Sequence, residues 1–235
     1  MESETMVEKK IHLPVSESDV RKLQVGDIVY VSGIVYTMRD MGHRRIVEMV
    51  QRGQNLPFNL KDGGIWHCGP ITRKVDDDWK ILSAGPTSSS RFTELGTRLV
   101  KDLNVRLVIG KGTMGTPMIN ALRDVGGVFL LATGGCAALY AKKVLNVENV
   151  HWLDLGMPEA TWVLKVDQLG PLIVGIDSKG RALSQMVLDK VSTRIEDIYR
   201  EENIDSSRTY VWWPKKIAGS MELMEYVRAS SSAEK

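Results

Sequence analysis

The order of apolar and polar positions changes about one third of the way along the chain. Before residue 79, the clearest elements are a β-prone run at residues 28–37 and a helical pattern from Arg39 to Gly53. After residue 79, a short apolar strand is followed by a helix three times in succession. The strands are centred on Ile81–Leu82, Leu107–Ile109 and Val128–Leu131, and the helices begin near Phe92, Thr116 and Ala137. Repeated strand–helix units imply right-handed crossovers, so we expect an α/β domain with a mainly parallel sheet here.

Weaker signals complete the predicted fold. Residues 54–78 hold several turn formers around one short strand at 65–68, with Asp76–Asp78 as a solvated turn. The periodicity also predicts an apolar segment at 11–15, strands at 151–155, 162–166 and 171–176, and a long helix that Ser184 caps and that carries Val187, Val191, Ile195 and Ile198. We expect a single domain over residues 1–205 and a C-terminal extension over 206–235 that is partly disordered.

Composition narrows the class of protein. The chain has 235 residues, of which 43% are hydrophobic, and a net charge of +2 at pH 7. Lys and Arg are spread along the sequence without a basic block, which disfavours a nucleic-acid partner. No apolar stretch reaches the roughly 18 residues that span a bilayer, and residues 1–10 lack the apolar core of a signal peptide. We therefore expect no membrane association and a cytoplasmic location.

The two cysteines do not form a recognisable site. Cys68 and Cys136 lie far apart and follow no metal or redox spacing, and this usage fits a reducing cytosol. His67 and Cys68 are adjacent, but neighbouring residues rarely serve one ion and the sequence has no second pair. We expect no metal site built by this chain alone.

The strand-to-helix turns are the candidate binding regions. Ligands of open α/β sheets collect where strands end, so the turns at 85–91, 110–116 and 133–136 should face one edge. The first turn, Gly-Pro-Thr-Ser-Ser-Ser-Arg, brings hydroxyls and a guanidinium to a helix start, whose free N–H groups favour an anion. The structural alternative is that Ser90 only caps the helix, as Thr116 is expected to cap the next one.

The glycine-rich turn after the second strand matches no complete nucleotide motif. The phosphate loop would need glycine at Val105 and a hydroxyl at Gly112. The dinucleotide fingerprint fits glycines 110, 112 and 115, but the acidic residue that it needs is missing from residues 129–133. Lys111 is therefore either a surface lysine or a contact for a smaller anion.

Arg39 stands at the start of a helix, where the macrodipole disfavours a cation. It therefore needs an anionic partner or another reason to be there, and Asp40 could supply that partner locally. His43 lies four residues further on, on the same helix face. A lone histidine is more often structural than catalytic, so both interpretations of His43 stay open.

Three cations thus occupy strand-to-helix turns: Arg39, Arg91 and Lys111. With Thr87 and the glycine-rich backbone beside them, they could hold a small dicarboxylate, with one carboxylate at each cationic pole. The spacing alone does not establish an enzyme.

Four motifs occur in this order in the class I fumarase and L-tartrate dehydratase β family, which the chain resembles over about residues 10–200. They are Tyr-Thr-Met-Arg-Asp-Met-Gly-His-Arg-Arg (36–45), the turn at 85–91, Gly-Lys-Gly-Thr-Met-Gly (110–115) and Gly-Gly-Cys-Ala-Ala (134–138). The resemblance implies a swivelling β/β/α domain, a three-layer arrangement with a partly parallel central sheet. That expectation agrees with the strand–helix units above.

The resemblance also implies an activity and a partner. Family members add water to a dicarboxylate or remove it, by hydration of fumarate to malate or dehydration of tartrate to oxaloacetate, with a [4Fe–4S] cluster that acts as a Lewis acid. Three cysteines hold that cluster, whereas this chain has two. The resemblance therefore implies a separate α subunit that carries the cluster, in an αβ or (αβ)2 assembly.

Roles follow from the resemblance by position. Arg39, Arg91 and Lys111 match carboxylate-binding residues, and Thr87 matches a threonine implicated in proton transfer, although an aliphatic hydroxyl is a poor base. Ser88 stands where the family frequently has a second threonine, and we count it among the substrate-binding residues. His43 matches a histidine whose role we leave open.

The sequence therefore predicts the β subunit of a two-subunit, iron–sulfur-dependent hydro-lyase, a fumarate hydratase, inactive without its α subunit. L(+)-tartrate dehydratase is the alternative within the family. A different class, a non-catalytic anion-binding or assembly module that kept the fold, stays open beside both.

Overall fold

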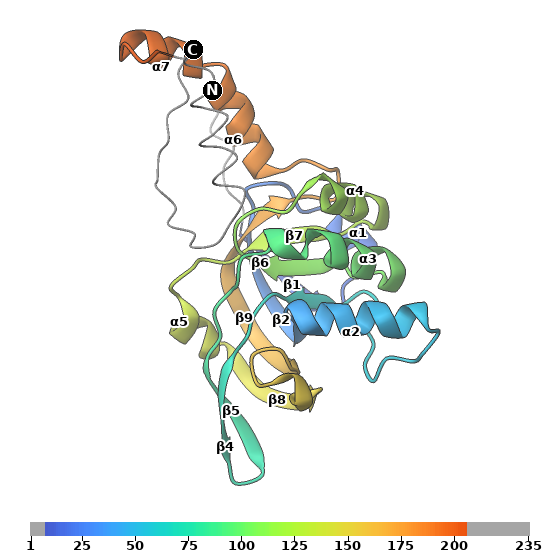
Figure 1. Cartoon of the computed structure of the whole chain (residues 1–235). Coiled ribbons are helices and arrows are strands. Elements are labelled where there is room, and N and C mark those ends of the chain that lie inside the picture. The colour runs from blue at the N-terminus through green and yellow to red at the C-terminus, as the bar shows by residue number, and fades with distance from the viewer. Residues whose placement is uncertain (1–7, 206–235) are drawn as a thin grey trace, which may run out of the picture. The chain divides into compact units, whose positions relative to one another are not determined.

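The computed structural model describes residues 8–205, and a seven-stranded sheet is the framework of the first of its two compact units, which ends at Met186 (Figure 1). The strand order of this sheet is β1-β2-β3-β6-β7-β9-β8, and the first five of these strands run parallel. The strands are β1 (Glu8–Leu13), β2 (Ile28–Thr37), β3 (Gly64–Trp66), β6 (Leu107–Gly110), β7 (Val128–Leu131), β8 (Val144–His151) and β9 (Thr161–Ile176). The strands predicted at 107–109 and 128–131 are parallel neighbours here, as expected, but the strand predicted at 81–82 is not part of this sheet, because it pairs antiparallel in a separate hairpin.

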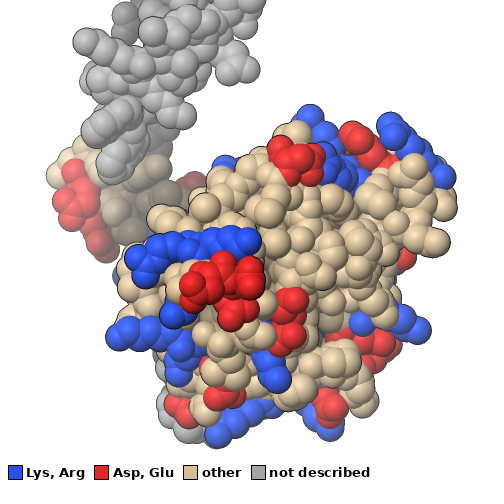
Figure 2. Space-filling model, turned by 90° about the horizontal axis from the view of Figure 1, so that it is seen from below, with Lys and Arg blue, Asp and Glu red and all other residues tan. Residues whose placement is uncertain are grey.

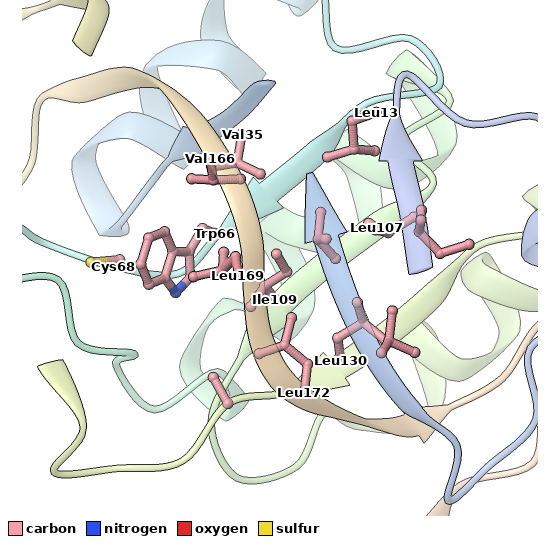
Figure 3. Close-up of a cluster of buried hydrophobic side chains, with 14 of the residues drawn as sticks. Leu13, Val35, Trp66, Cys68, Leu107, Ile109, Leu130, Val166, Leu169 and Leu172 are labelled. Atoms are coloured by element: carbon pink, nitrogen blue, oxygen red, sulfur yellow. The ribbon is translucent and has the colours of Figure 1, made fainter. Parts of the chain in front are cut away.

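The long strand β9 closes part of this sheet into a small barrel-like ring. It pairs antiparallel with β7 and β8 and also with β2, so β2, β3, β6, β7 and β9 form a continuous circuit. Buried side chains lie between β9 and the parallel strands, among them Trp66, Ile109, Leu130, Leu169 and Leu172 (Figure 3). Burial of this apolar surface stabilises the closed arrangement.

The opposite face of the parallel strands is covered by helices. Ile65, Val108 and Phe129 alternate with residues of the first cluster, because successive side chains of a strand point to opposite faces. They pack in a second buried cluster against α2 (Asp40–Gln51), α3 (Thr93–Leu103) and α4 (Thr116–Val125). The architecture is thus mixed α/β, with a mostly parallel sheet and a barrel-like part. The finer three-layer swivelling description stays a prediction at this point.

A two-stranded hairpin projects from the sheet (Figure 1). It consists of β4 (Ile71–Val75) and β5 (Asp78–Ser83), and Asp76 and Asp77 form its turn, as predicted. Trp79 anchors the hairpin by packing edge-on against Trp162, with 5.1 Å between ring centroids. The prediction of a single strand within residues 54–78 was therefore incomplete, because β4 is mostly exposed and carries no hydrophobic alternation.

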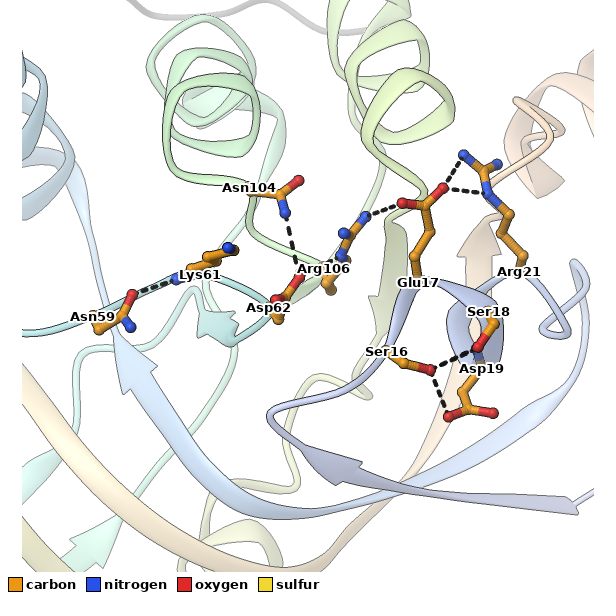
Figure 4. A network of polar contacts seen from close by, with 10 residues as sticks. All are labelled: Ser16, Glu17, Ser18, Asp19, Arg21, Asn59, Lys61, Asp62, Asn104 and Arg106. Carbon is orange, nitrogen blue, oxygen red and sulfur yellow. Dashed lines mark hydrogen bonds and ion pairs between the residues drawn. The ribbon is translucent and has the colours of Figure 1, made fainter.

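A polar network ties together the amino-terminal ends of the parallel strands (Figure 4). The guanidinium of Arg106, just before β6, lies 2.8 Å from Asp62 and 3.3 Å from Glu17 in the short helix α1 (Glu17–Val20). The Arg106 side chain is only 8% exposed, so both carboxylates satisfy a largely buried cation. Hydrogen bonds from Arg21 and the charge of Arg106 lower the pKa of Glu17. This end of the sheet is occupied by structure-stabilising contacts.

Three predicted elements near the C-terminal part of the sheet were wrong in detail. The strand predicted at 151–155 is displaced: β8 ends at His151, Trp152 has a φ of 63°, and Leu153–Leu155 forms a 3-10 turn. Half of the residues of β8 are polar and none is buried, because β8 is an edge strand, so its hydrophobic signal is weak. The two strands predicted at 162–166 and 171–176 are one strand, since a register shift opposite Val29–Val31 accommodates Gly170–Pro171.

Three predicted caps were also wrong. The Ser90 side chain caps no helix, because residues 90–92 form a 3-10 turn (η1) before α3 and its N-cap, Phe92, makes no capping bond. Gly115 is the N-cap of α4, so Thr116 is the first residue inside the helix, and the N–H of Gly115 donates to the hydroxyl of Thr93. Ser184 lies inside a helix that begins at Leu183.

The chain divides into two compact units, the second of which begins at Val187. The long helix predicted from Ser184 is two helices, α6 (Leu183–Ser192) and α7 (Ile195–Glu201). The hydroxyls of Ser192 and Thr193 bond back to carbonyls three residues earlier, which competes with continuation of the helix. The extension predicted at 206–235 lies outside the described residues. None of the helices within residues 8–205 has the length and apolar character to cross a bilayer.

Candidate active site

The three predicted turns meet at the carboxyl edge of the parallel strands. Ser88 forms a β-bridge with Lys111, and the N–H of Ser89 donates to the Lys111 carbonyl at 2.9 Å. The Lys111 side chain lies over the third turn, since a β-carbon on Gly134 would be 3.2 Å from its Cδ. The prediction that these turns share one edge is confirmed.

Arg91 is the centre of contacts in the first turn. Its Nη2 donates to the Thr87 hydroxyl at 3.2 Å and lies 3.1 Å from a carboxylate oxygen of Asp40. The guanidinium carbon also sits 4.8 Å from the centroid of the Phe92 ring, a cation–π contact. Since the Arg91 side chain is 42% exposed, it remains accessible while these three contacts orient it.

Arg39 lies beside the same region but has a different partner from the one predicted. Its Nε is 3.3 Å from Glu159, on the segment before β9, whereas its neighbour Asp40 pairs with Arg91. Of the alternatives left open for Arg39, an anionic partner is therefore the one found, but that partner is Glu159 and not Asp40. Gly69 makes room for Arg39: a β-carbon there would lie 2.8 Å from its Cδ.

Lys111 differs from the two arginines in having no ion pair among residues 8–205. It follows β6 directly and its backbone is held on both sides, by Ser88 and Ser89. Among the ion pairs within residues 8–205, Arg39, Arg91 and Lys111 are matched by two carboxylates, those of Asp40 and Glu159, which leaves one positive charge in this part of the chain without a counter-charge. We call this part of the strand edge, with Arg39, Thr87, Arg91 and Lys111, the rim. Its excess of positive charge is suited to an anion.

The face of the molecule seen from below carries charges of both signs (Figure 2). On the face shown in Figure 2, Lys and Arg side chains lie next to Asp and Glu side chains, with uncharged surface between them. A polyanion would need a continuous basic stripe. The excess charge at the strand edge is local, which fits a ligand with one or two carboxylates.

His43 is fully buried beneath the rim. Its Nδ1 donates to the Arg39 carbonyl at 2.8 Å, and its ring stacks on Phe92 with centroids 4.9 Å apart. Burial lowers the pKa of His43 to about 4, so the imidazole is neutral at pH 7. His43 therefore contacts the backbone of Arg39 through its ring and exposes no surface to solvent.

Sequence reasoning missed two buried polar residues and one acid. His67 and Ser89 lie under the turns, with Nδ1 and Oγ 2.9 Å apart, and Glu159 holds Arg39 from a distant segment. The sequence offered one signal for Ser89, its position two residues after Thr87 in the run of hydroxyl residues. That Ser89 is the fully buried member of this run is visible only in the structure. Nothing in the sequence singled out Glu159.

The residues of this chain do not fit an iron–sulfur cluster. Cys68 is fully buried in the apolar cluster, and burial raises the pKa of its thiol well above the usual range, which disfavours the thiolate that binds iron. Cys136 is half-buried and packs against the same cluster. Within residues 8–205, no three His, Cys, Asp or Glu side chains come together as a metal-binding group.

Fold and site define a mixed α/β protein with three cationic side chains on turns at the carboxyl edge of a mostly parallel sheet. The family model described as "Fumarase C-terminus" matches residues 1–187. The chain therefore belongs to this family, which confirms the resemblance to the class I fumarase and tartrate dehydratase β family.

Individual relatives agree with this assignment. The chain is 45% identical over 184 residues to a protein of Methanocaldococcus jannaschii provisionally named L(+)-tartrate dehydratase subunit beta, covering 78% of this chain and 94% of that protein. It is 38% identical over 177 residues to the L(+)-tartrate dehydratase subunit beta of Escherichia coli K12, covering 75% and 87%. A provisionally named class I fumarate hydratase of Geobacillus stearothermophilus is 36% identical over 194 residues, covering 80% of this chain but 37% of that longer protein.

Proposed function

We propose that this chain is the β subunit of a two-subunit hydro-lyase that depends on a [4Fe–4S] cluster, and that fumarate hydration is its activity. The proposal is supported by the contacts that join the turns carrying the cations of the rim. Arg91 bonds to Thr87 and pairs with Asp40, the residue after Arg39. Ser88 forms a bridge with Lys111. In a family of dicarboxylate hydro-lyases, this rim is the half of the site that binds the substrate carboxylates.

The division of labour follows from the donor groups. Arg91 can bind a carboxylate through two hydrogen bonds in one plane. Lys111, which unlike Arg39 and Arg91 has no ion pair within residues 8–205, binds the other end of the substrate as a point charge. Arg39 adds positive potential from the start of α2, and Ser88 offers a hydroxyl next to Lys111. The cluster belongs to the partner α subunit, since the cysteines of this chain do not fit it.

Thr87 is proposed as the group nearest the chemistry. Its Oγ1 accepts a hydrogen bond from Arg91, which leaves its own O–H free to donate to a bound substrate. The same guanidinium would stabilise an alkoxide, but an aliphatic hydroxyl is a poor base. We therefore assign Thr87 to orienting the substrate and holding a proton at Oγ1.

The fold suits a subunit that closes on a partner. We propose that the helices α2 to α4, the parallel strands beneath them and the β-rich part with β8 and β9 act as the three layers of a swivelling domain. Its active form would be an αβ or (αβ)2 assembly in the cytoplasm.

L(+)-tartrate is the second candidate substrate. The names of the M. jannaschii and E. coli relatives support it, and those proteins match this chain over most of their own length. The two substrates differ in hydroxylation, and a site discriminates strongly only where it hydrogen-bonds that hydroxyl. Those contacts can lie on either subunit, so kinetics must decide between the two.

Anaerobic reconstitution of this chain with its α subunit tests the proposal. The complex should hydrate fumarate with a kcat/KM above that for dehydration of L-tartrate, while this chain alone should turn over neither. A higher kcat/KM for L-tartrate than for fumarate would make L-tartrate the preferred substrate and fumarate the alternative. A complex with a full cluster but without either activity would favour a non-catalytic anion-binding or assembly module, and turnover by the isolated chain would refute the division of labour.

A further inference from the structure

Two buried polar residues join the turns that carry Thr87 and Lys111. Ser89 is fully buried and His67 is 1% exposed, and both lie beneath the rim. The Ser89 hydroxyl is set apart from those beside it, because Ser88 and Ser90 are exposed. A hydroxyl buried in this way needs hydrogen-bond partners, and Ser89 finds them on both sides.

The direction of these hydrogen bonds can be assigned. The backbone N–H of Lys111 donates to Ser89 Oγ at 3.1 Å, so the oxygen acts as an acceptor there. The hydroxyl proton then has His67 Nδ1, 2.9 Å away, as its acceptor within the described residues. His67 must therefore carry its proton on Nε2. Burial, followed by the neighbouring His43 ring and the Arg91 guanidinium, lowers the pKa of His67 well below its ordinary value, so the ring stays neutral and Nδ1 keeps its lone pair.

The backbones of the same two residues hold both turns. The His67 carbonyl accepts the N–H of Thr87 at 2.8 Å, and the His67 N–H donates to the carbonyl of Ile109 at 2.8 Å. The N–H of Ser89 donates to the Lys111 carbonyl at 2.9 Å. Each turn is thus fixed by a backbone bond and, through Ser89 Oγ, by a side-chain bond.

Gly110 shows how tightly the pair is enclosed. A β-carbon at this position would collide with Ser89 Oγ and would lie 3.0 Å from His67 Nδ1. The Ser89 hydroxyl therefore has little room to change rotamer. It fits at this position because Gly110 has no side chain. The geometry describes a rigid connection beneath the rim.

We propose that His67 and Ser89 form a positioning pair that sets the separation between Thr87 and Lys111 in the substrate complex. The inference rests on the proposed function and extends it to two residues that do not touch substrate. Without the Ser89 hydroxyl, the Lys111 N–H loses its acceptor and the second turn can shift relative to the first. Arg91 and Arg39 keep their own contacts, so the loss should appear in kcat more than in KM.

Steady-state kinetics of the reconstituted complex test the pair. Ser89→Ala and His67→Leu should lower kcat about 10- to 100-fold, the range that a displacement of up to about 1 Å can produce, with KM changed less than about threefold. His67→Asn, whose amide oxygen can accept near the Nδ1 position, should recover most of that loss relative to His67→Leu. The matched control is Ser90→Ala, which removes an exposed hydroxyl from the same turn and should stay within about twofold of the unchanged protein.

A second measurement keeps the test independent of activity. Nitrogen-15 NMR of the histidines in the full chain should show the His67 ring as the neutral tautomer protonated on Nε2 from pH 6 to 8, and Ser89→Ala should shift its Nδ1 resonance. A ring protonated on Nδ1, or a Ser89→Ala complex with unchanged kcat, would overturn the proposal. If the unchanged complex has no hydro-lyase activity but the tautomer is as stated, the proposed function fails and the hydrogen-bond assignment stands.

Discussion

Arg91 and Asp40 are bound to each other at the rim, with Nη2 of the guanidinium 3.1 Å from Oδ2 of the carboxylate. They come from different turns, so their contact joins the start of α2 to the turn after β5. Both side chains are close to half-exposed, and an exposed pair of this kind contributes little to stability. Its consequence is orientation: Asp40 and Thr87 together fix where the Arg91 guanidinium points.

The first prediction concerns this pair. Asp40→Ala should lower kcat/KM for the dicarboxylate about 10-fold, because Arg91 loses one of the contacts that orient its guanidinium. Asp40→Asn, which keeps an acceptor oxygen, should lose less. A lower KM in Asp40→Ala would contradict this account, because it would mean that Asp40 competes with the substrate for Arg91.

The second prediction concerns Lys111. Lys111→Ala should lower kcat/KM about 100-fold or more, as removal of a site-defining electrostatic contact in an enclosed site commonly does. The control is Lys101→Ala, which removes an exposed cation in the last turn of α3 and should change kcat/KM less than about twofold. Equal, small effects of both substitutions in the reconstituted complex would support the non-catalytic alternative.

The third prediction concerns acid stability. The pKa of His43 is about 4 in the folded chain and near the ordinary value of 6.5 when unfolded, and that of His67 is lowered in the same direction. Between these values the unfolded chain binds more protons, so the free energy of unfolding is highest above pH 6.5 and falls as the pH drops towards 4. The slope should approach about 1.4 kcal/mol per pH unit for each buried histidine.

Urea unfolding between pH 5 and 7 measures that slope. His43→Gln should reduce the slope, whereas His12→Asn, at an exposed histidine on β1, should leave it unchanged. Carboxylates with lowered pKa, such as Asp19 and Asp154, lose their contributions at lower pH and do not account for a slope above pH 5. A stability that is flat across this range would show that His43 is not buried in the neutral form.

The fourth prediction concerns the cysteines. A thiol-reactive disulfide reagent at pH 8 should modify Cys136 in the native chain and both cysteines in denaturant, because burial raises the pKa of Cys68 and keeps it from solvent. Cys136→Ser should abolish the native reaction. Anaerobic treatment of this chain with iron and sulfide should add no [4Fe–4S] absorption, and a stable cluster on this chain alone would overturn the assignment of the cluster to the partner.

The apolar pattern was sufficient for the elements with a buried face. β2, α2, β6, α4 and β7 lie close to their predicted positions, because strands covered on both faces and amphipathic helices carry a strong periodic signal. β8 and the hairpin β4–β5 carried little of that signal because one of their faces meets solvent. The caps failed for a related reason: Ser90 and Thr116 have suitable side chains, and the tertiary contacts of the turns decided which groups are bonded.

The sequence by itself determined the strand–helix units that begin with β6 and β7, the order of the turns and the three cations on them, since these follow from local periodicity. It did not determine that β5, the strand before the first turn, pairs in an antiparallel hairpin outside the parallel sheet. The tertiary structure alone decided the partners of those cations. Glu159 reaches Arg39 from more than 100 positions away, and Ser89 with His67 links two turns that are separate in the chain. Local patterns report which face of an element is buried, but the pairing of polar groups depends on three-dimensional distances that only the closed sheet sets.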